Sequence, residues 1–241
     1  MTIVLSEIRI KRDQMTQSIV SGLKDRSRLH LNRGVFTEEF HGERTWFEYR
    51  LLGEQNLDAN FGRFRYPDQH PLGFARGELA DPLVETELPF SDVKPFDVSP
   101  DVGGEIVDMY QSILARLCRV GEIRSEYGET AKRDVTNVQL YNERITGIGT
   151  YVAEAKIQEE PEILTLDSDQ GIRARLIAPQ VERQVIESAM SSADNYGLRD
   201  LGIVEDLFKS LIRLTLSVEV MYVKHRKGDR ADKDKLRSGA G

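Results

Sequence analysis

Apolar residues recur along the chain at steps of three and four positions, the spacing that places them on one face of an α-helix. No region sustains the alternation of apolar and polar residues that indicates a half-buried β-strand. We therefore predict an all-α fold, a single large helical-bundle domain over residues 1–226, because the first helix would expose its apolar face if it stood alone. The predicted helices cover roughly residues 5–31, 45–60, 104–124, 133–158, 178–195 and 203–226.

Two segments interrupt this helical pattern. Residues 61–103 hold most of the prolines of the chain together with many glycines and acidic residues, which predicts a long loop region or a lid. Residues 227–241 contain almost no apolar side chains, so we expect a disordered tail. Aromatic residues in the first segment argue against a free linker, since disordered chains are poor in them; they are Phe61, Phe64, Tyr66, Phe74, Phe90 and Phe96.

The charge balance restricts the class of partner. The chain has 33 Lys and Arg residues against 40 Asp and Glu residues, a net charge of −7 at pH 7. Its one short basic run lies at the C-terminus, so we expect no nucleic-acid partner. Charges near the N-terminus exclude the apolar core of a secretion signal, and no apolar stretch is long enough to cross a membrane. We expect a cytoplasmic protein with no membrane partner, and secretion would require a signal peptide that has been removed.

The single cysteine, Cys118, excludes an internal disulfide and leaves the redox compartment open. Its neighbours Leu114, Leu117 and Val120 are apolar. We therefore expect a buried helix residue and not a reactive thiol.

Several polar residues interrupt the apolar faces of the predicted helices. Thr215 and Glu219 lie one turn apart on the same face, and Glu219 has apolar neighbours on both sides. Burying an ionised carboxylate without a partner is costly, so such a glutamate is either paired with a cation or protonated. Lys156 lies at the end of a helix face that otherwise carries small and apolar residues, although a lysine near a helix end is commonly a solvated charge. None of these residues specifies a function by itself.

Taken in order along the chain, short motifs resemble the all-helical chorismate mutases, most closely the larger dimeric enzymes of yeasts, fungi and plants. The motif with the highest specificity is VAEAK at 152–156, and the resemblance covers roughly residues 5–226. It implies a homodimeric isomerase that converts chorismate to prephenate, either in aromatic amino-acid biosynthesis or as a secreted enzyme that diverts a host's chorismate. The other motifs are weak alone but collinear: Ile8-Arg9, KDRSR at 24–28, FEYRLL at 47–52, FRYPD at 64–68, YGETAKRD at 127–134, RITGIGTYVAEAK at 144–156, VERQVIE at 181–187 and LTLSVEVMY at 214–222.

The implied reaction is an intramolecular pericyclic shift, which needs no nucleophile, metal or cofactor. The protein would hold the compact reactive conformer and stabilise charge that develops on the ether oxygen. By the resemblance, Arg9 and Arg144 would each bind one substrate carboxylate, because the guanidinium fork matches a carboxylate. Lys156 would donate to the ether oxygen and to a carboxylate.

The resemblance also assigns roles to three residues near the end of the chain. Glu182 would bind the substrate hydroxyl, and Thr215 would line the same pocket. Glu219, kept protonated by its apolar setting, would donate a second hydrogen bond to the ether oxygen, a known use of a raised carboxyl pKa.

The chain departs from the family pattern at two positions. In the family the carboxylate-binding arginine stands eleven residues before the lysine, whereas Arg144 and Lys156 are twelve apart. At about 100° per residue, the extra position rotates Arg144 by about a quarter-turn. Either a one-residue π-bulge in the segment 146–149 restores the register, or Arg144 misses the pocket. The second departure is Ala178, where related enzymes carry an asparagine that contacts a carboxylate.

The resemblance also bears on regulation. Yeast-type enzymes bind aromatic amino acids through paired arginines and a Gly-Ser step, and the matching positions here are Gly62-Arg63 and Gly128-Glu129. One arginine and the serine are missing, and Glu129 adds a charge unfavourable to an amino-acid carboxylate. We expect an enzyme without aromatic amino-acid allostery.

Two other functions stay open at the level of sequence. A catalytically weakened or inactive relative could keep the helical scaffold and act as a protein-binding effector, in a secreted form if a leader was removed. The chain could also catalyse a different reaction on a molecule related to chorismate.

Overall fold

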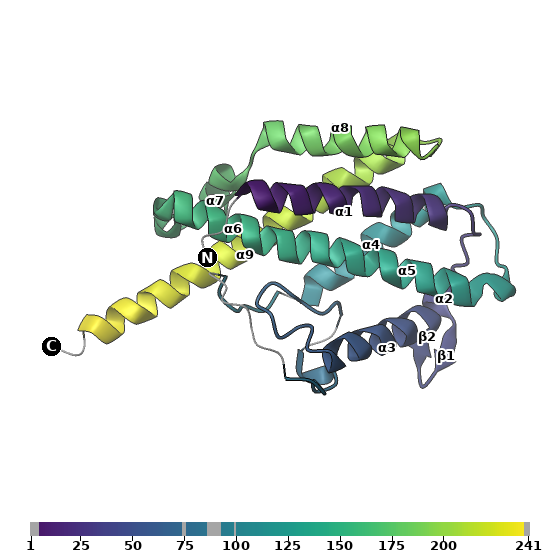
Figure 1. Ribbon diagram of the computed structural model, residues 1–241, viewed down its shortest axis with the longest axis horizontal. Coiled ribbons are helices and arrows are strands. Elements are labelled where there is room, and N and C mark those ends of the chain that lie inside the picture. Colours follow the sequence, from purple (N-terminus) through teal and green to yellow (C-terminus); the bar gives the residue numbers. More distant parts are fainter. Residues whose placement is uncertain (1–4, 74–75, 86–92, 99, 239–241) are drawn as a thin grey trace.

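Helices make up most of the described part of the chain. The computed structural model describes residues 5–73, 76–85, 93–98 and 100–238 (Figure 1). In the described residues the sheet is limited to a small antiparallel hairpin of β1 (Glu39–His41) and β2 (Arg44–Thr45). The prediction of an all-α fold without significant sheet is therefore confirmed. Within the described residues, no helix is both apolar enough and long enough to cross a membrane. The helices are α1 (Leu5–Arg26), α2 (Gly34–Thr37), α3 (Trp46–Asn60), α4 (Pro100–Leu117), α5 (Tyr127–Asn142), α6 (Ile148–Glu159), α7 (Asp169–Leu176), α8 (Pro179–Asn195) and α9 (Leu201–Ser238).

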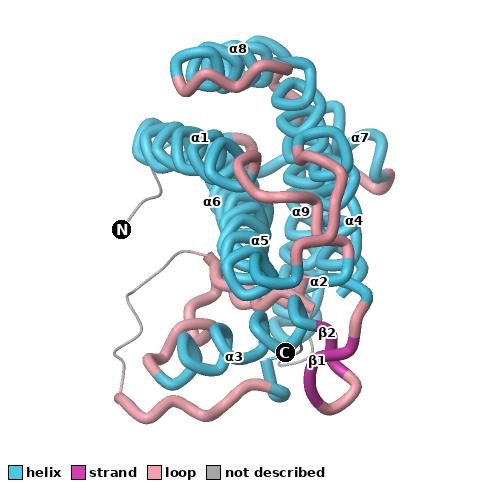
Figure 2. The backbone as a smooth tube through the Cα atoms, turned by 90° about the vertical axis from the view of Figure 1, so that its right-hand side faces the viewer, coloured by secondary structure: helices cyan, strands magenta, loops and turns pink. Residues whose placement is uncertain are grey.

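Helix α9 is the central element of the bundle. Helices α4, α6, α7 and α8 all pack against it. Its buried apolar residues follow the helical spacing read from the sequence, as at Val204, Leu207, Leu211, Leu214 and Val218. Figure 2 shows α8 and α1 on one side of the bundle and α3 with the hairpin on the opposite side.

Helices α5 and α6 form one long rod through a π-helical segment, Glu143–Gly147. Figure 1 shows this rod running beside α1. Helices α1 and α6 share a small apolar cluster, separate from the main core, that contains Ile8, Met15, Ile148 and Ala155. This cluster fixes the N-terminal half of α1 against α6.

Helix α1 ends at Arg26, five residues before the predicted end at residue 31. The fully buried Arg26 guanidinium donates to the carbonyl oxygens of His30 at 2.7 Å and Leu31 at 2.8 Å. Its Nε also donates to Asp134 Oδ1 at 2.6 Å, and Tyr110 donates to the same oxygen at 2.6 Å. The chain after α1 therefore folds back onto this guanidinium and does not continue as a helix.

Side-chain caps explain where α3 and α7 begin. Thr45 Oγ1 accepts from the backbone N of Glu48 at 3.2 Å, and the Glu48 carboxylate accepts from the Thr45 N, which is a capping box. The sequence pattern did not predict α7, because only Ile172 and Leu176 of its eight residues are buried. Ser168 caps α7 by accepting from Gly171 N at 3.1 Å.

The predicted loop region at 61–103 is irregular where the structure describes it, apart from a short 3₁₀ turn at Arg76–Glu78 and the start of α4. Phe96 is buried and packs edge-on against the Tyr222 ring, with the centroids 5.1 Å apart. This contact ties the segment to α9. Phe74 and Phe90 lie outside the described residues.

The C-terminal segment differs from the tail that we expected at 227–241. Helix α9 continues to Ser238, and residues 239–241 lie outside the described part of the chain. Lys227 forms an ion pair with Asp167 and also donates to the carbonyl of Leu166. Lysine and arginine have good helix propensity, so a segment without apolar residues can still form a helix.

Cys118 is buried immediately after α4, which confirms its prediction as a buried residue, although α4 itself ends at Leu117. Burial raises the pKa of its thiol to about 11, and Arg26 donates to its sulfur. The thiol is therefore protonated at neutral pH and unreactive.

The buried ion pair between Arg26 and Asp134 predicts a stability effect. Asp134→Ala leaves the guanidinium buried without its counter-charge, so we expect a loss of about 3–5 kcal/mol in the free energy of unfolding, measured by urea denaturation. Asp25→Ala is the matched control, because Asp25 pairs at the surface with Arg28 and with Arg133, each at 3.2 Å, and such exposed pairs should contribute less than about 1 kcal/mol each. Equal losses in the two variants would contradict the assignment.

Candidate active site

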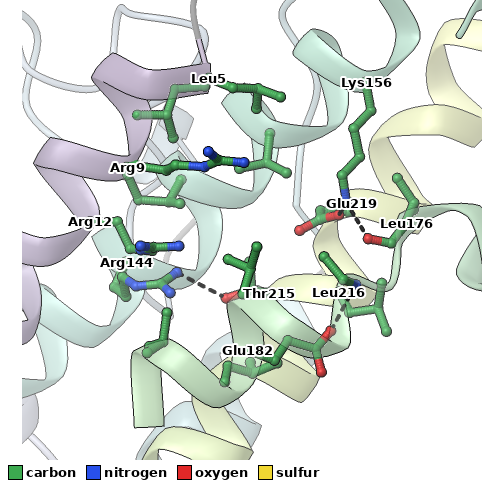
Figure 3. Close-up of a pocket in the computed structure, with 17 residues that line it drawn as sticks. Leu5, Arg9, Arg12, Arg144, Lys156, Leu176, Glu182, Thr215, Leu216 and Glu219 are labelled. Carbon is green, nitrogen blue, oxygen red and sulfur yellow. Dashed lines mark hydrogen bonds and ion pairs between the residues drawn. The ribbon is translucent and has the colours of Figure 1, made fainter. Parts of the chain in front are cut away.

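A pocket of about 130 Å³ lies among α1, α6, α8 and α9 (Figure 3). Its walls are apolar, with contributions such as Ile8, Val152, Val185 and Leu216. Charged and hydroxyl groups from all four helices and from the π-helical segment reach the same space. The polar lining residues are Arg9, Arg12, Arg144, Lys156, Glu182, Thr215 and Glu219.

All six residues that the resemblance assigned to catalysis line this one pocket, and so does Ala178. They come from segments far apart in the sequence: Arg9 on α1, Arg144 and Lys156 on the long rod, Glu182 on α8, and Thr215 with Glu219 on α9. The pocket also contains Arg12, which our sequence reasoning missed. Arg12 stands three positions after Arg9, and that one-turn spacing was the available signal.

The π-helical segment decides whether Arg144 reaches the pocket. The π-helix covers Glu143–Gly147, so it absorbs the extra residue between Arg144 and Lys156. Both side chains line the same cavity. A π turn is present as predicted, but it covers Glu143–Gly147 and so begins three residues before the predicted segment 146–149. The alternative in which Arg144 misses the pocket is wrong. A π turn adds one residue without advancing the register of the helix that follows it.

Close packing explains the two glycines in this region. A Cβ on Gly147 would lie 3.2 Å from the carbonyl oxygen of Asp68, and a Cβ on Gly149 would lie 3.2 Å from that of Thr215. Helix α6 therefore approaches α9 closely at the wall of the pocket. Hydroxyl groups also support the distorted turn, since Thr146 donates to the carbonyl of Asn142 at 2.7 Å and Thr150 to that of Thr146 at 2.7 Å.

Arg144 is a buried cation with few partners. The residue is only 4% exposed, and its Nε has no hydrogen-bond partner among the described residues. Its Nη1 makes one long contact of 3.5 Å to Thr215 Oγ1, whose proton goes to the carbonyl of Leu211. Burial lowers the pKa of Arg144 to about 10, helped by the nearby charge of Arg12. The guanidinium remains charged at neutral pH and can bind an anion.

Lys156 and Glu219 face each other at another part of the pocket wall (Figure 3). Lys156 Nζ donates to the carbonyl of Leu176 and lies 3.6 Å from Glu219 Oε2, beyond a hydrogen bond. Glu219 is 6% exposed, and its Oε2 accepts no hydrogen bond from the described residues. Burial raises the pKa of Glu219 to about 7, against the opposing charges of Lys156 and Arg144. A protonated Glu219 can donate a hydrogen bond into the pocket near neutral pH.

Glu182 lies at the start of α8, where its Oε1 accepts from the backbone N of Ala178 at 3.2 Å. This bond keeps the carboxylate at the pocket wall, with its other oxygen available to a ligand hydroxyl. Ala178 itself offers no side-chain donor. Arg9 is exposed at the rim of the pocket.

The pocket is suited to an anionic ligand. Its lining holds four cations against two carboxylates, one of which has a pKa near 7. In the described part of the chain, no group of three or more His, Cys, Asp or Glu side chains could hold a metal ion. The site can therefore bind and orient a small anionic molecule, and can donate hydrogen bonds to its uncharged oxygens.

Comparison with known proteins gives one consistent answer, although no family model matches the chain. The chloroplastic chorismate mutase 1 of Arabidopsis thaliana is 30% identical over 209 residues, which cover 81% of this chain but only 59% of that protein, less than two thirds. The chloroplastic chorismate mutase 1 of Zea mays is 28% identical, covering 93% of this chain and 79% of that protein. The chorismate mutase of Emericella nidulans is 26% identical over 92% of both chains.

Solved structures agree with these relatives. A crystal structure of AtCM1 with tyrosine bound in its allosteric site superposes with a TM-score of 0.80 at 27% identity, covering 93% of this chain and 96% of that one. The Aro7p chorismate mutase of Candida albicans, in complex with L-Trp, gives a TM-score of 0.83 at 25% identity and covers 94% and 93%. In sequence and in fold, the chain resembles the all-helical chorismate mutases of plants, fungi and yeasts.

Proposed function

We propose that the chain is a chorismate mutase, an isomerase that converts chorismate to prephenate. The observation that supports this most strongly is the pocket shared by Arg144 and Lys156, because that pocket depends on a π-helical segment at the one place where the chain has an extra residue. The named relatives and structural neighbours support the same activity.

The reaction is concerted and internal to the substrate. The ether carbon–oxygen bond breaks as a new carbon–carbon bond forms, so no atom enters or leaves, and no cofactor takes part. The protein accelerates the reaction by holding the compact conformer and by stabilising negative charge on the ether oxygen as its bond breaks. Both tasks need fixed donors in a water-poor pocket.

The cations serve the two substrate carboxylates and the ether oxygen. Arg144, buried and lacking a partner for its Nε, binds one carboxylate, and its desolvation is then compensated by the bound charge. Arg9, at the rim, binds the other carboxylate. Lys156 donates to the ether oxygen, where charge develops in the transition state.

The acidic residues complete the pocket. Glu182 accepts from the substrate hydroxyl with the oxygen that does not cap α8. Glu219 in its protonated form donates a second hydrogen bond to the ether oxygen from beside Lys156, and Thr215 lines the space between Arg144 and Glu219. A neutral carboxylic acid donates without adding a charge that would repel the carboxylates.

Regulation by aromatic amino acids is absent in this proposal. Arg63 is already engaged by Asp58 at 3.2 Å and by Glu143 at 3.3 Å. Glu129 forms an ion pair with Arg133 at 2.8 Å and stands where the regulated enzymes have a serine. Both features disfavour an amino-acid carboxylate. We also propose a homodimer, as in the enzymes that the chain resembles.

One observation favours a weakened or non-catalytic relative instead, namely Ala178, which supplies no side-chain donor to the pocket. In that case the scaffold would serve to bind a protein partner. The same turnover measurement separates the two functions.

We expect the purified chain to consume chorismate and release prephenate, followed by NMR of both compounds. Lys156→Ala should lower kcat/KM by about a hundredfold or more, since it removes a donor to the developing charge. Arg28→Ala, which removes an exposed charge beyond α1, is the matched control and should leave kcat/KM unchanged. An inactive wild-type chain contradicts the proposed function, and activity insensitive to Lys156→Ala contradicts the role of Lys156.

The raised pKa of Glu219 predicts a pH dependence. The donor is the protonated form, so kcat/KM should be high below pH 7 and should fall as pH rises through the pKa of about 7. Glu219→Gln is a permanent donor of similar shape, so its profile should be flat across the same range. If wild type and Glu219→Gln show the same pH profile, Glu219 does not have this role.

The absence of regulation has its own test. Initial rates with millimolar tyrosine, phenylalanine or tryptophan should match the rates without them, because Arg63 and Glu129 offer no free cation–serine pair for the amino-acid carboxylate. A change in KM or in the shape of the saturation curve on adding any of the three would contradict this expectation.

A further inference from the structure

Arg12 is a second guanidinium at the Arg144 end of the pocket. It lines the cavity, and its side chain is only 14% exposed. Figure 3 shows the Arg12 and Arg144 guanidinium groups next to each other, both directed into the pocket from the side of α1 and the π-helical segment. Lys156 and Glu219 lie across the pocket from them.

Protein carboxylates only partly offset these two cations. Arg144 forms no ion pair with a carboxylate among the described residues, and the charge of Arg12 lowers its pKa while the charges of Glu219 and Asp13 act in the opposite direction. Arg12 bonds one carboxylate, that of Asp13, to which its Nε and Nη2 both donate at 2.9 and 2.7 Å. Asp13 is 60% exposed and adjacent in sequence, so this pair contributes little to stability.

Two like charges held together in a partly buried site repel each other. Folding alone does not require Arg12 to lie beside Arg144, because a cation on α1 can stay at the surface, as the neighbouring Lys11 does where it pairs with Glu143 at 3.5 Å. A bound carboxylate between the two guanidinium groups would turn this repulsion into two charge-assisted contacts. The unpartnered Nε of Arg144 is one donor that such a carboxylate would satisfy.

We propose that Arg12 is a substrate-binding residue whose guanidinium, together with that of Arg144, binds one carboxylate of the dianionic substrate. This inference rests on the proposed function and adds a specificity residue to it. Arg12 supplies a donor in a pocket that lacks the asparagine side chain at Ala178. It also selects for ligands with a carboxylate at this end over otherwise similar neutral molecules.

The test uses Arg12→Gln and Arg12→Lys in the full chain. Steady-state kinetics with chorismate give KM and kcat, and isothermal titration calorimetry gives the Kd of prephenate, which keeps both carboxylates. Arg12→Gln should raise KM and the prephenate Kd by about tenfold to a hundredfold, the usual range for one charge-assisted hydrogen bond. The change in kcat should be smaller, since the contact exists in both ground and transition states. Arg12→Lys should recover part of the loss, because it keeps the charge but not the fork.

Two control variants separate binding from structure. Asp13→Asn removes the surface partner of Arg12 and should leave KM unchanged or lower it, whereas it would reproduce the defect if Arg12 acted only through Asp13. Arg28→Gln also removes one positive charge, but at a surface position outside the pocket, so it should change neither KM nor the prephenate Kd.

The outcomes distinguish this inference from the function on which it rests. An active wild-type chain with unchanged KM and prephenate Kd in Arg12→Gln overturns the role of Arg12 and leaves the proposed function intact. A defect of equal size in Asp13→Asn or Arg28→Gln also overturns it. A wild-type chain that neither turns over chorismate nor binds prephenate overturns both.

Discussion

An α-helix turns by about 100° per residue, so two side chains on one helix share a face only at particular spacings. Arg144 and Lys156 are twelve residues apart, which is one residue too many for both to face the same cavity from a regular helix. The π-helical segment Glu143–Gly147 absorbs the extra residue. Gly149 lets the rod lie close against α9 at Thr215, and Gly147 lets it lie close to the loop at Asp68. The composition of the pocket depends on this one turn, because without it the buried cation would face elsewhere.

The two buried arginines show how differently the chain treats buried charge. Arg26 is fully buried but saturated by Asp134 and two carbonyl oxygens, so it works as a structural element that ends α1. Arg144 is buried almost as deeply, yet it makes one long hydrogen bond and no ion pair among the described residues, and the like charge of Arg12 lies nearby. Burying a cation without a counter-charge costs desolvation free energy, and an anionic ligand that pairs with the cation offsets that cost. In a chain of net charge −7, the cations of the pocket form a local positive field.

Helix α9 connects the core to the chemistry. Its apolar stripe packs against four other helices, and the same helix presents Thr215 and Glu219 to the pocket one turn apart. Because α9 is central, the apolar packing that stabilises the bundle also removes water from around Glu219 and raises its pKa. The electrostatics of the site are therefore a consequence of the packing and not of a separate local arrangement.

The sequence by itself determined the helical class and most helix positions, because these depend on periodic burial. The resemblance of its motifs to a known family indicated the six residues that line the pocket. It did not determine the end of α1, which the buried Arg26 decides through contacts with distant Asp134, nor the helix α7, which buries too few residues to show a periodic pattern. The sequence left two outcomes for Arg144, and it did not distinguish Arg12 from the other charges of α1. Only the tertiary structure decided both, because register across a π turn and the proximity of two guanidinium groups depend on how α1, α6 and α9 pack together.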